Sequence, residues 1–361
     1  MKQNYFEVCV RSATYNHAPY IVDTLNGFTM QETNFPYVCC IIDDASTDGE
    51  PEIIRKYLQE NFELEEESVV RNEETDDYVL CFAQHKTNKN CYFAVLWLKY
   101  NHYSLNKKKW QYIAEWNDNA QYIAICEGDD YWIHPRKLQM QFNYMTNHTE
   151  CTMTCHRAQL YSEKKKKIIG EQYCRISDGV LNPIDVINRT GLYIPTCSLM
   201  FKPSIMDNYP EYCRNCNVGD YPLQIMAAMK GKIYYFNEIM SVYRIDNPMS
   251  WVGKQKFKSI DPSRLFIVRS QMEMFIGFAD SYPQYKKIYT NKIAEHIIKN
   301  MPFGDRPDSI QCYVGLFGNE IKNFDLRWKF IMMIYRSPAI YLRKKFSRMF
   351  LKKYMPLRMI Y

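Results

Sequence analysis

The chain has 361 residues, 47% of them hydrophobic, and a formal net charge of +6. This length accommodates two domains with sizeable cores, and the hydrophobic content excludes a largely disordered chain. No apolar run approaches the roughly 20 residues that a membrane helix needs, and residues 1–7 lack the apolar core of a secretion signal. Thirteen cysteines without a framework spacing indicate reduced thiols, so we expect a cytoplasmic protein.

The first part of the chain predicts alternating strands and helices. Strands are expected at residues 6–10 and 37–42, and helices at residues 20–28 and 52–61, with a loop at residues 12–16. A β-α-β-α order of this kind predicts a parallel sheet.

The rest of the chain mixes both kinds of element. Apolar residues recur at helical spacing in residues 90–103, 110–116 and 135–147, which predicts three helices. Four consecutive lysines, residues 164–167, indicate a solvated hairpin tip. The remaining expected elements are strands at 152–155, 198–201, 232–236 and 239–244, a helix at 221–229 and a mostly helical segment after residue 251.

Two acidic pairs each follow a short apolar run. Asp43-Asp44 closes residues 37–42, and Asp129-Asp130 follows residues 122–126. Such runs suit strands of a parallel sheet that is buried on both faces, and open α/β sheets bind ligands beyond the carboxyl ends of their strands. We therefore expect both pairs at one edge of the sheet, together with a nucleotide and a cation, because a bound cation offsets the repulsion between paired carboxylates.

Short polar motifs stand at the ends of the expected elements. They are Thr14-Tyr15-Asn16, Ile42-Asp43-Asp44-Ala45-Ser46-Thr47-Asp48-Gly49, Glu127-Gly128-Asp129-Asp130-Tyr131-Trp132, Gly219-Asp220-Tyr221-Pro222-Leu223, and Tyr243-Arg244 with Ser250-Trp251. Their order and spacing resemble the family 2 glycosyltransferases with a GT-A fold, of the bacterial surface-polysaccharide type. The similarity covers roughly residues 5–251.

The resemblance implies an α/β fold of the GT-A (Rossmann-like) type, with a mixed, mainly parallel sheet flanked by helices. We expect a catalytic domain over residues 1–255, with a nucleotide-binding half at about residues 1–130 and an acceptor half at residues 131–255. Residues 256–361 are expected to form a helical, basic C-terminal extension.

The resemblance also implies roles for individual residues. Asp44 would contact the base of a nucleotide sugar, and Asp129 would lie near its ribose. Asp130 would hold a divalent metal ion, Mn2+ or Mg2+, on the diphosphate, and Asp220 would be the general base of an inverting transfer. The other residues expected at the donor site are Thr14, Tyr15, Asn16 and Arg244.

The residues by themselves leave alternatives open. Asp44 could cap a helix, Asp129-Asp130 could be a solvated turn, Asp220 could be an N-cap, and Arg244 could form a surface ion pair instead of contacting the diphosphate. A metal ion held by one or two carboxylates and phosphate oxygens would neutralise a leaving diphosphate. The chain has no Gly-rich phosphate loop, which argues against dinucleotide enzymes and P-loop kinases.

Two functions fit these patterns. The first is a metal-dependent inverting glycosyltransferase that moves a sugar from a nucleotide-diphosphate sugar, with a UDP-sugar as the expected donor, to a hydroxyl of a glycan or lipid-linked acceptor in surface-polysaccharide synthesis. The second is a catalytically silent nucleotide- or sugar-binding partner subunit on the same fold. A nucleotidyltransferase is a weaker option, because residues 12–16 lack the Gly-rich basic loop that it normally has.

The end of the chain carries most of the basic character. From Leu326 onward there are ten Lys and Arg residues and no Asp or Glu, interleaved with apolar residues. This pattern predicts a basic amphipathic helix on an anionic membrane surface, which would place the protein at the inner face of the cell membrane. A helix packed on the catalytic domain or on another subunit is the alternative. Nucleic acid is not an expected partner.

Overall fold

The computed structural model of the chain describes residues 5–66, 69–174, 176–189, 193–247 and 262–300. The chain divides into two compact units. The first comprises residues 1–186, 190–209 and 223–255, and the second comprises residues 187–189, 210–222 and 256–361. Residues 248–261 are outside the described ranges, so the domain boundary expected at residue 255 stays a prediction.

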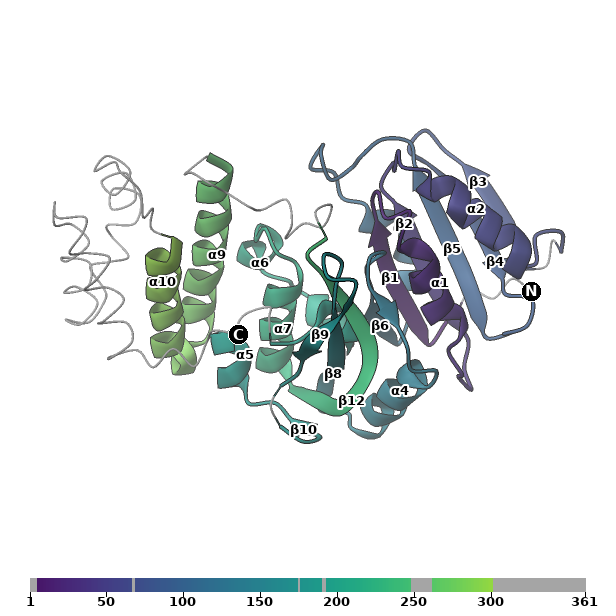
Figure 1. The fold of residues 1–361 in the computed structure, drawn as a ribbon. Coiled ribbons are helices and arrows are strands. Elements are labelled where there is room, and N and C mark those ends of the chain that lie inside the picture. The colour runs from purple at the N-terminus through teal and green to yellow at the C-terminus, as the bar shows by residue number, and fades with distance from the viewer. Residues whose placement is uncertain (1–4, 67–68, 175, 190–192, 248–261, 301–361) are drawn as a thin grey trace. The chain divides into compact units, whose positions relative to one another are not determined.

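A mixed sheet is the centre of the first unit (Figure 1). The described residues supply it with twelve strands, ten of which follow the order β10-β12-β8-β11-β6-β1-β2-β5-β4-β3, while β7 pairs with β12 and β9 with β8. The strands are β1 (Val8–Thr14), β2 (Tyr37–Asp43), β3 (Arg71–Glu74), β4 (Tyr78–Gln84), β5 (Cys91–Leu98), β6 (Tyr122–Ile125), β7 (Tyr131–Trp132), β8 (Cys151–Ser162), β9 (Lys167–Gln172), β10 (Gly179–Val180), β11 (Met200–Phe201) and β12 (Lys232–Ile245).

The neighbours β6, β1, β2 and β5 run parallel, as do β8 and β12. The other pairings are antiparallel, as in β11 between β6 and β8. This arrangement confirms the mixed α/β sheet flanked by helices that the sequence predicts. The parallel group lies in the centre, so the carboxyl ends of β1, β2 and β6 meet at one edge.

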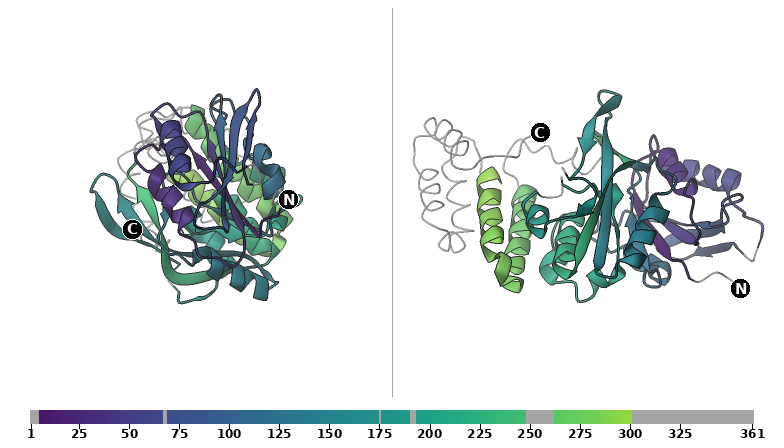
Figure 2. Two further views of the ribbon diagram at one scale, coloured as in Figure 1. Left: turned by 90° about the vertical axis from the view of Figure 1, so that its right-hand side faces the viewer. Right: turned by 90° about the horizontal axis from the view of Figure 1, so that it is seen from below.

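Helices cover both faces of the parallel strands (Figures 1 and 2). On one face, α1 (Ile21–Thr29), α2 (Glu50–Asn61) and α4 (Lys137–Asn147) share a hydrophobic core with β1, β2 and β5. On the other face, the 3-10 helix η1 (Trp110–Ile113) and α3 (Ala114–Asn117) close a second core. Alternate residues of these strands enter opposite cores, which explains why β2 before Asp43, and all of β5, are apolar.

The remaining helices are short or belong partly to the second unit. They are α5 (Pro183–Arg189), η2 (Thr196–Ser198), η3 (Pro203–Met206), α6 (Glu211–Arg214), α7 (Asp220–Lys230), α9 (Pro262–Ser281), η4 (Pro283–Tyr285) and α10 (Lys286–Asn300). In the second unit, the Tyr212 ring of α6 packs edge-on against Phe278 of α9, with the ring centroids 5.2 Å apart. No helix among the described residues is long and apolar enough to cross a membrane.

The structure corrects one expected helix. Residues 90–103 were expected to be helical, but residues 91–98 form β5, in which all eight side chains are buried. The strand lies between β2 and β4 with a core on each face, and a strand buried on both faces loses the alternation that distinguishes it from a helix. Similarly, residues 12–14, expected in a loop, complete β1.

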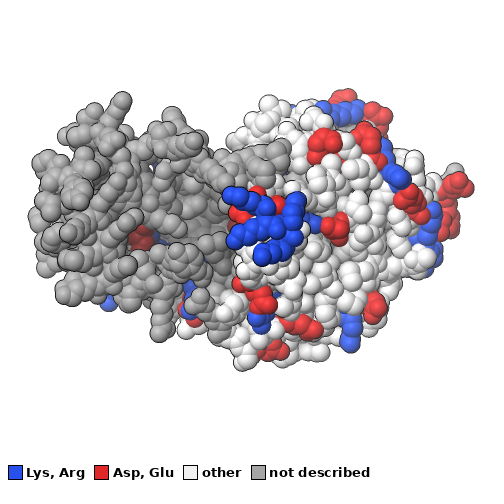
Figure 3. Space-filling model, in the orientation of Figure 1, with Lys and Arg blue, Asp and Glu red and all other residues white. Residues whose placement is uncertain are grey.

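Other expected elements are confirmed. The helices at residues 20–28, 52–61, 135–147 and 221–229 are found as α1, α2, α4 and α7, and the two strands expected between residues 232 and 244 are one strand, β12, with irregular pairing to β8. Lys164, Lys165 and Lys166 lie in the turn between β8 and β9, and Lys167 begins β9; Figure 3 shows Lys and Arg side chains gathered there. The basic segment after Leu326 lies outside the described residues.

Candidate active site

The two acidic pairs lie on either side of the end of β1. Asp43 ends β2, and the turn that carries Asp129 and Asp130 follows β6. The backbone of β1 contacts both segments: the Thr14 carbonyl accepts the N–H of Asp44 at 3.0 Å, and the Ala13 carbonyl accepts the N–H of Gly128 at 3.1 Å. The expectation that both pairs share one edge of the sheet is therefore confirmed.

A buried glutamate ties the loops after β1 and β2 together. Glu50 is fully buried at the start of α2, and its carboxylate accepts the Thr14 hydroxyl, the His17 backbone N–H at 2.8 Å and the Ser46 hydroxyl at 2.9 Å. Burial raises the pKa of Glu50, and the hydrogen bonds from Thr14 and His17 oppose that rise. The loop after β1 is thus fixed from inside the protein.

The predicted donor-site segment Thr14-Tyr15-Asn16 belongs to this fixed loop. Asn16 has a left-handed backbone, with φ of 58°, and interlocks the loops: its N–H donates to the Ser46 hydroxyl at 2.9 Å, and its side-chain oxygen accepts the N–H of Thr47 at 2.8 Å. Thr14 is buried, whereas Tyr15 is partly exposed. The structure therefore gives Thr14 and Asn16 positions that shape the loop.

Asp44 organises a long loop between β5 and η1. Its side chain is almost fully buried and accepts the backbone N–H groups of His102 and Tyr103 at 2.6 and 3.2 Å. Lys109 adds an ion pair at 3.1 Å. A carboxylate offers about four acceptor positions, so one position is left after these three donors. Asp44 does not cap α2, because that helix follows Gly49 and the N–H of Glu50, its first residue, donates to the Asp48 carboxylate.

Asp43, next to it, is also buried, and its carboxylate accepts the Ser46 N–H at 3.3 Å. Burial raises the pKa of Asp43 to about 6, with a further contribution from the negative charge of Asp44.

The Asp129-Asp130 pair divides into an inward and an outward carboxyl group. Asp130 is 3% exposed, and its carboxyl group accepts the backbone N–H of Arg244 at 2.8 Å. Burial and the adjacent Asp129 raise the pKa of Asp130 well above its usual range. The side chain of Asp129 is 16% exposed and lies 3.8 Å from His17 Nε2. The carboxyl group of Asp130 is therefore the more enclosed of the two, and its metal role stays a prediction.

Arg244 supports this turn from β12. Its guanidinium donates to the carbonyl of Asp129 at 2.7 Å and pairs with Asp23 and with Glu163, the latter at 3.1 Å. With 5% of its side chain exposed, Arg244 is buried, so it does not form the surface ion pair considered above. The guanidinium contacts protein groups, so in this structure Arg244 stabilises the turn.

Asp220 is the first residue of α7, where its carboxylate accepts the N–H of Tyr221 at 2.8 Å. It belongs to the second unit, and Asp44 and Asp129 belong to the first. The base role of Asp220 therefore stays a prediction.

Sequence reasoning missed His17 and Glu50. Glu50 resembled an ordinary first-turn acid of a helix, and His17 stands in a loop that has no metal-ligand spacing. Their partners Thr14 and Asp129 come from other elements, so only the fold brings the four side chains together.

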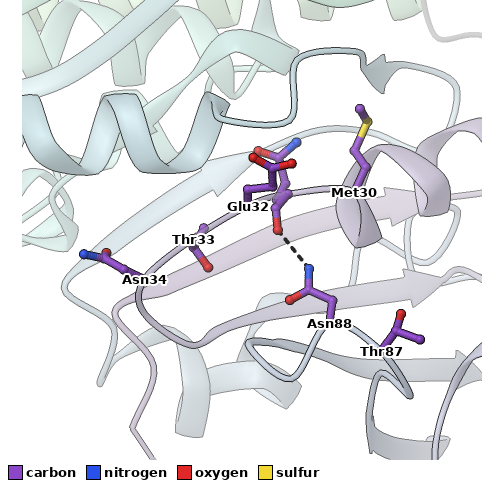
Figure 4. Close-up of a pocket in the computed structure, with 7 residues that line it drawn as sticks. Met30, Glu32, Thr33, Asn34, Thr87 and Asn88 are labelled. Carbon is purple, nitrogen blue, oxygen red and sulfur yellow. Dashed lines mark hydrogen bonds between the residues drawn. The ribbon is translucent and has the colours of Figure 1, made fainter.

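Two further features bear on the site. No cluster of three or more His, Cys, Asp and Glu side chains suited to a metal ion occurs in the described ranges. A surface hollow lies beside the loops that precede β2 and β5, at the opposite edge of the sheet from the acidic pairs (Figure 4). The Asn88 amide in it donates to the carbonyls of Thr29 and Gln31, so its polar groups maintain a loop contact.

Comparisons with known proteins agree with this arrangement. Residues 9–80, which span β1 to β4, match the family described as Glycosyl transferase family 2. Uncharacterized proteins of Mycobacterium bovis and Mycobacterium tuberculosis are 28% identical over 233 residues, which is 64% of this chain. The match covers 57% of the length of these relatives, so this chain corresponds to little more than half of them.

Solved structures give the same fold. S. aureus TarS residues 1–349, in complex with UDP, superimposes with a TM-score of 0.57 at 12% identity and covers 96% of this chain and 87% of that one. A second S. aureus TarS structure gives a TM-score of 0.54 at 13% identity, with 96% and 53% covered. These likenesses show a fold of the GT-A type, and residues 9–80 of the chain are similar to the family 2 glycosyltransferases.

Proposed function

We propose that this chain is an inverting glycosyltransferase that uses a nucleotide-diphosphate sugar. Its acceptor is a hydroxyl of a glycan or lipid-linked molecule, in the synthesis of a surface polysaccharide. The observation that carries the proposal is the position of Asp44 and Asp129 beyond the carboxyl ends of parallel strands, on either side of β1. Ligands of open α/β sheets bind at such an edge.

UDP is the proposed nucleotide, because the similar TarS structure contains it. Asp44 has one acceptor position left beside the three donors of the loop after β5. Because Asp44 is 1% exposed, it acts on the base mainly through the loop that it holds. The same loop carries Tyr103, which is 69% exposed and provides a ring on which a base can stack.

We assign the metal contact to Asp129 instead of Asp130. Asp129 is partly exposed and next to the glycine of the turn, whereas the carboxyl group of Asp130 is enclosed. Mn2+ or Mg2+ bound to such a carboxylate and to the diphosphate would neutralise the charge that develops on the leaving group. Arg244 holds the carbonyl of Asp129, and Asp130 holds the N–H of Arg244, so both position the turn.

Two further residues are proposed to bind the ribose and to activate the acceptor. Glu127 is pinned by the N–H of Ala13 at 3.1 Å and is partly exposed beside Asp129, where it can accept a ribose hydroxyl. Asp220 is proposed as the base that removes the proton of the acceptor hydroxyl. Its replacement by Asn should lower turnover by roughly 100-fold or more while nucleotide binding stays.

The test is nucleotide release from a panel of nucleotide sugars, with Mn2+ or Mg2+ and acceptor extracts, combined with calorimetry of UDP binding. Asp129→Asn should abolish metal-dependent UDP binding. Asp130→Asn, its matched neighbour, should retain more of that binding, because Asn still accepts the N–H of Arg244. Binding without turnover for every donor would favour the silent partner subunit. Equal losses in both variants would refute the assignment of the metal to Asp129.

We also propose that the basic segment after Leu326 binds the inner face of the cell membrane, which brings the enzyme to a lipid-linked acceptor. Truncation after Pro307 should weaken sedimentation with anionic vesicles at low salt and leave UDP binding intact. Equal sedimentation of the full and truncated chains would refute the membrane role.

A further inference from the structure

From the hydrogen bonds around His17 we assign its ring proton to Nδ1. Thr14 Oγ1 lies 3.1 Å from His17 Nδ1 and is also hydrogen-bonded to Glu50 Oε1. Glu50 accepts two more donors, the His17 N–H and the Ser46 hydroxyl, so the carboxyl group is the acceptor in all three contacts. Since the Thr14 hydroxyl uses its single proton to donate to Glu50, it accepts the proton of His17 Nδ1.

With the proton on Nδ1, the other ring nitrogen, Nε2, has a lone pair to offer to a metal ion. Nε2 lies 3.8 Å from Asp129 Oδ2, which is too far for a hydrogen bond. A nitrogen lone pair and a carboxylate therefore face each other in a side-chain pair that is only slightly exposed. Histidines that bind metals usually have the other ring N–H held by a protein acceptor, as Thr14 and Glu50 hold Nδ1 here.

The surrounding backbone keeps the imidazole in this position. The N–H of His17 is bound to Glu50, and its carbonyl accepts the N–H groups of Tyr20 and Ile21 at the start of α1. A Cβ on Gly128 would lie 3.2 Å from His17 Nδ1 and 2.2 Å from Thr14 Oγ1. The glycine therefore makes room for His17 and Thr14 beside the Asp129 turn.

We propose that His17 Nε2 and Asp129 together bind the divalent cation of the donor site. A cation with ligand bonds of about 2.1 Å holds neighbouring ligands about 3 Å apart, so a side-chain movement of under about 1 Å brings both groups to one ion. An imidazole ligand makes the site favour transition metals such as Mn2+ or Co2+ over Mg2+. The inference rests on the proposed function, because the donor diphosphate supplies the remaining ligands.

The direct test is electron spin-echo spectroscopy of Mn2+ bound to the full chain with UDP. A coordinated imidazole gives a nitrogen coupling, which changes character when the protein carries 15N-histidine. We expect this coupling in the natural sequence and in His134→Gln, whose imidazole pairs with Glu238 at 3.0 Å. We expect its loss in His17→Asn, because Asn keeps a donor toward Thr14 but has no group equivalent to Nε2.

Calorimetry of Mn2+ and Mg2+ binding in the presence of UDP gives a second readout. His17→Asn should lower the Mn2+ affinity roughly tenfold or more and the Mg2+ affinity less, with near-ultraviolet circular dichroism confirming the fold. Metal-dependent UDP binding without a histidine nitrogen coupling would overturn the role of His17 and leave the proposed function standing. The absence of any metal-dependent binding of UDP or GDP would overturn both.

Discussion

Arg244→Met tests whether this arginine stabilises the fold or binds the donor diphosphate. The buried guanidinium reaches Asp23, Glu163 and the carbonyl of Asp129. Its removal leaves the buried Glu163 with Lys166, at 2.6 Å, as its counter-ion. Breaking a buried ion pair costs about 3–5 kcal/mol, whereas the pair with the half-exposed Asp23 contributes at most about 1 kcal/mol.

Because Lys166 still neutralises Glu163 in part, we expect the lower figure: Arg244→Met should reduce the free energy of unfolding by about 3 kcal/mol. For a unit of this size the melting temperature should fall by about 6–12 °C. Urea and thermal unfolding measure both quantities. The double variant Arg244→Met/Glu163→Leu should recover part of the loss, because it removes the unpaired charge as well.

Two results would refute this reasoning. The first is unchanged unfolding together with weaker binding of UDP and Mn2+, which would make Arg244 a ligand of the diphosphate, as the sequence pattern suggested. The second is a double variant no more stable than Arg244→Met, which would mean that Glu163 is not left unpaired.

Three further predictions concern the same sheet edge. The pKa of Asp43 is raised from an ordinary value of about 3.9 to about 6, so the folded state holds its proton more tightly. Stability should therefore fall by about 3 kcal/mol as the pH rises from about 4 to 6 and then level off, and Asp43→Asn should flatten this dependence in urea unfolding. Gly128→Ala should cost about 1–3 kcal/mol through the contact with Thr14, whereas Gly219→Ala, whose Cβ meets nothing within 4 Å, should stay within about 0.5 kcal/mol; equal effects would contradict the packing argument. Asp44→Asn should speed proteolysis of the loop at residues 101–109, because the ion pair with Lys109 is lost; an unchanged cleavage rate would mean that the loop is held by other contacts.

The sequence predicted that the two acidic pairs share one edge of the sheet, because that position depends on local patterns. Apolar runs that end in carboxylates define strand ends, and the β-α-β-α order makes the strands parallel. The misassigned segment at residues 90–103 shows where this reasoning stops. A strand buried on both faces has no polar face, so its aromatic residues can match a helical period by chance. Only pairing with β2 and β4 distinguishes the two structures, and pairing is not visible in a single segment.

The difference in exposure between Asp129 and Asp130 could not be predicted from the sequence, for a different reason. Both carboxylates stand in one turn with the same neighbours, and no spacing rule separates them. Their difference comes from β12, far along the chain, where the N–H of Arg244 faces Asp130 and its guanidinium binds the carbonyl of Asp129. The loop after β1 also distinguishes the two carboxylates, because Glu50 and Thr14 hold His17 beside Asp129.

These contacts suggest why an acidic pair is needed where one exposed carboxylate would bind a metal. A turn that carries a charged ligand needs a fixed backbone, since a displaced ligand loses affinity. Asp130 supports the turn by accepting the backbone N–H of Arg244 in β12. It can accept this hydrogen bond in its protonated or its ionised form. Asp129 is then left to face outward. On this view Asp130→Asn, which keeps the acceptor, should be mild, and Asp130→Ala, which leaves the N–H of Arg244 buried without a partner, should cost about 1–3 kcal/mol. If both substitutions weaken UDP and Mn2+ binding alike while unfolding stays unchanged, Asp130 binds the metal after all.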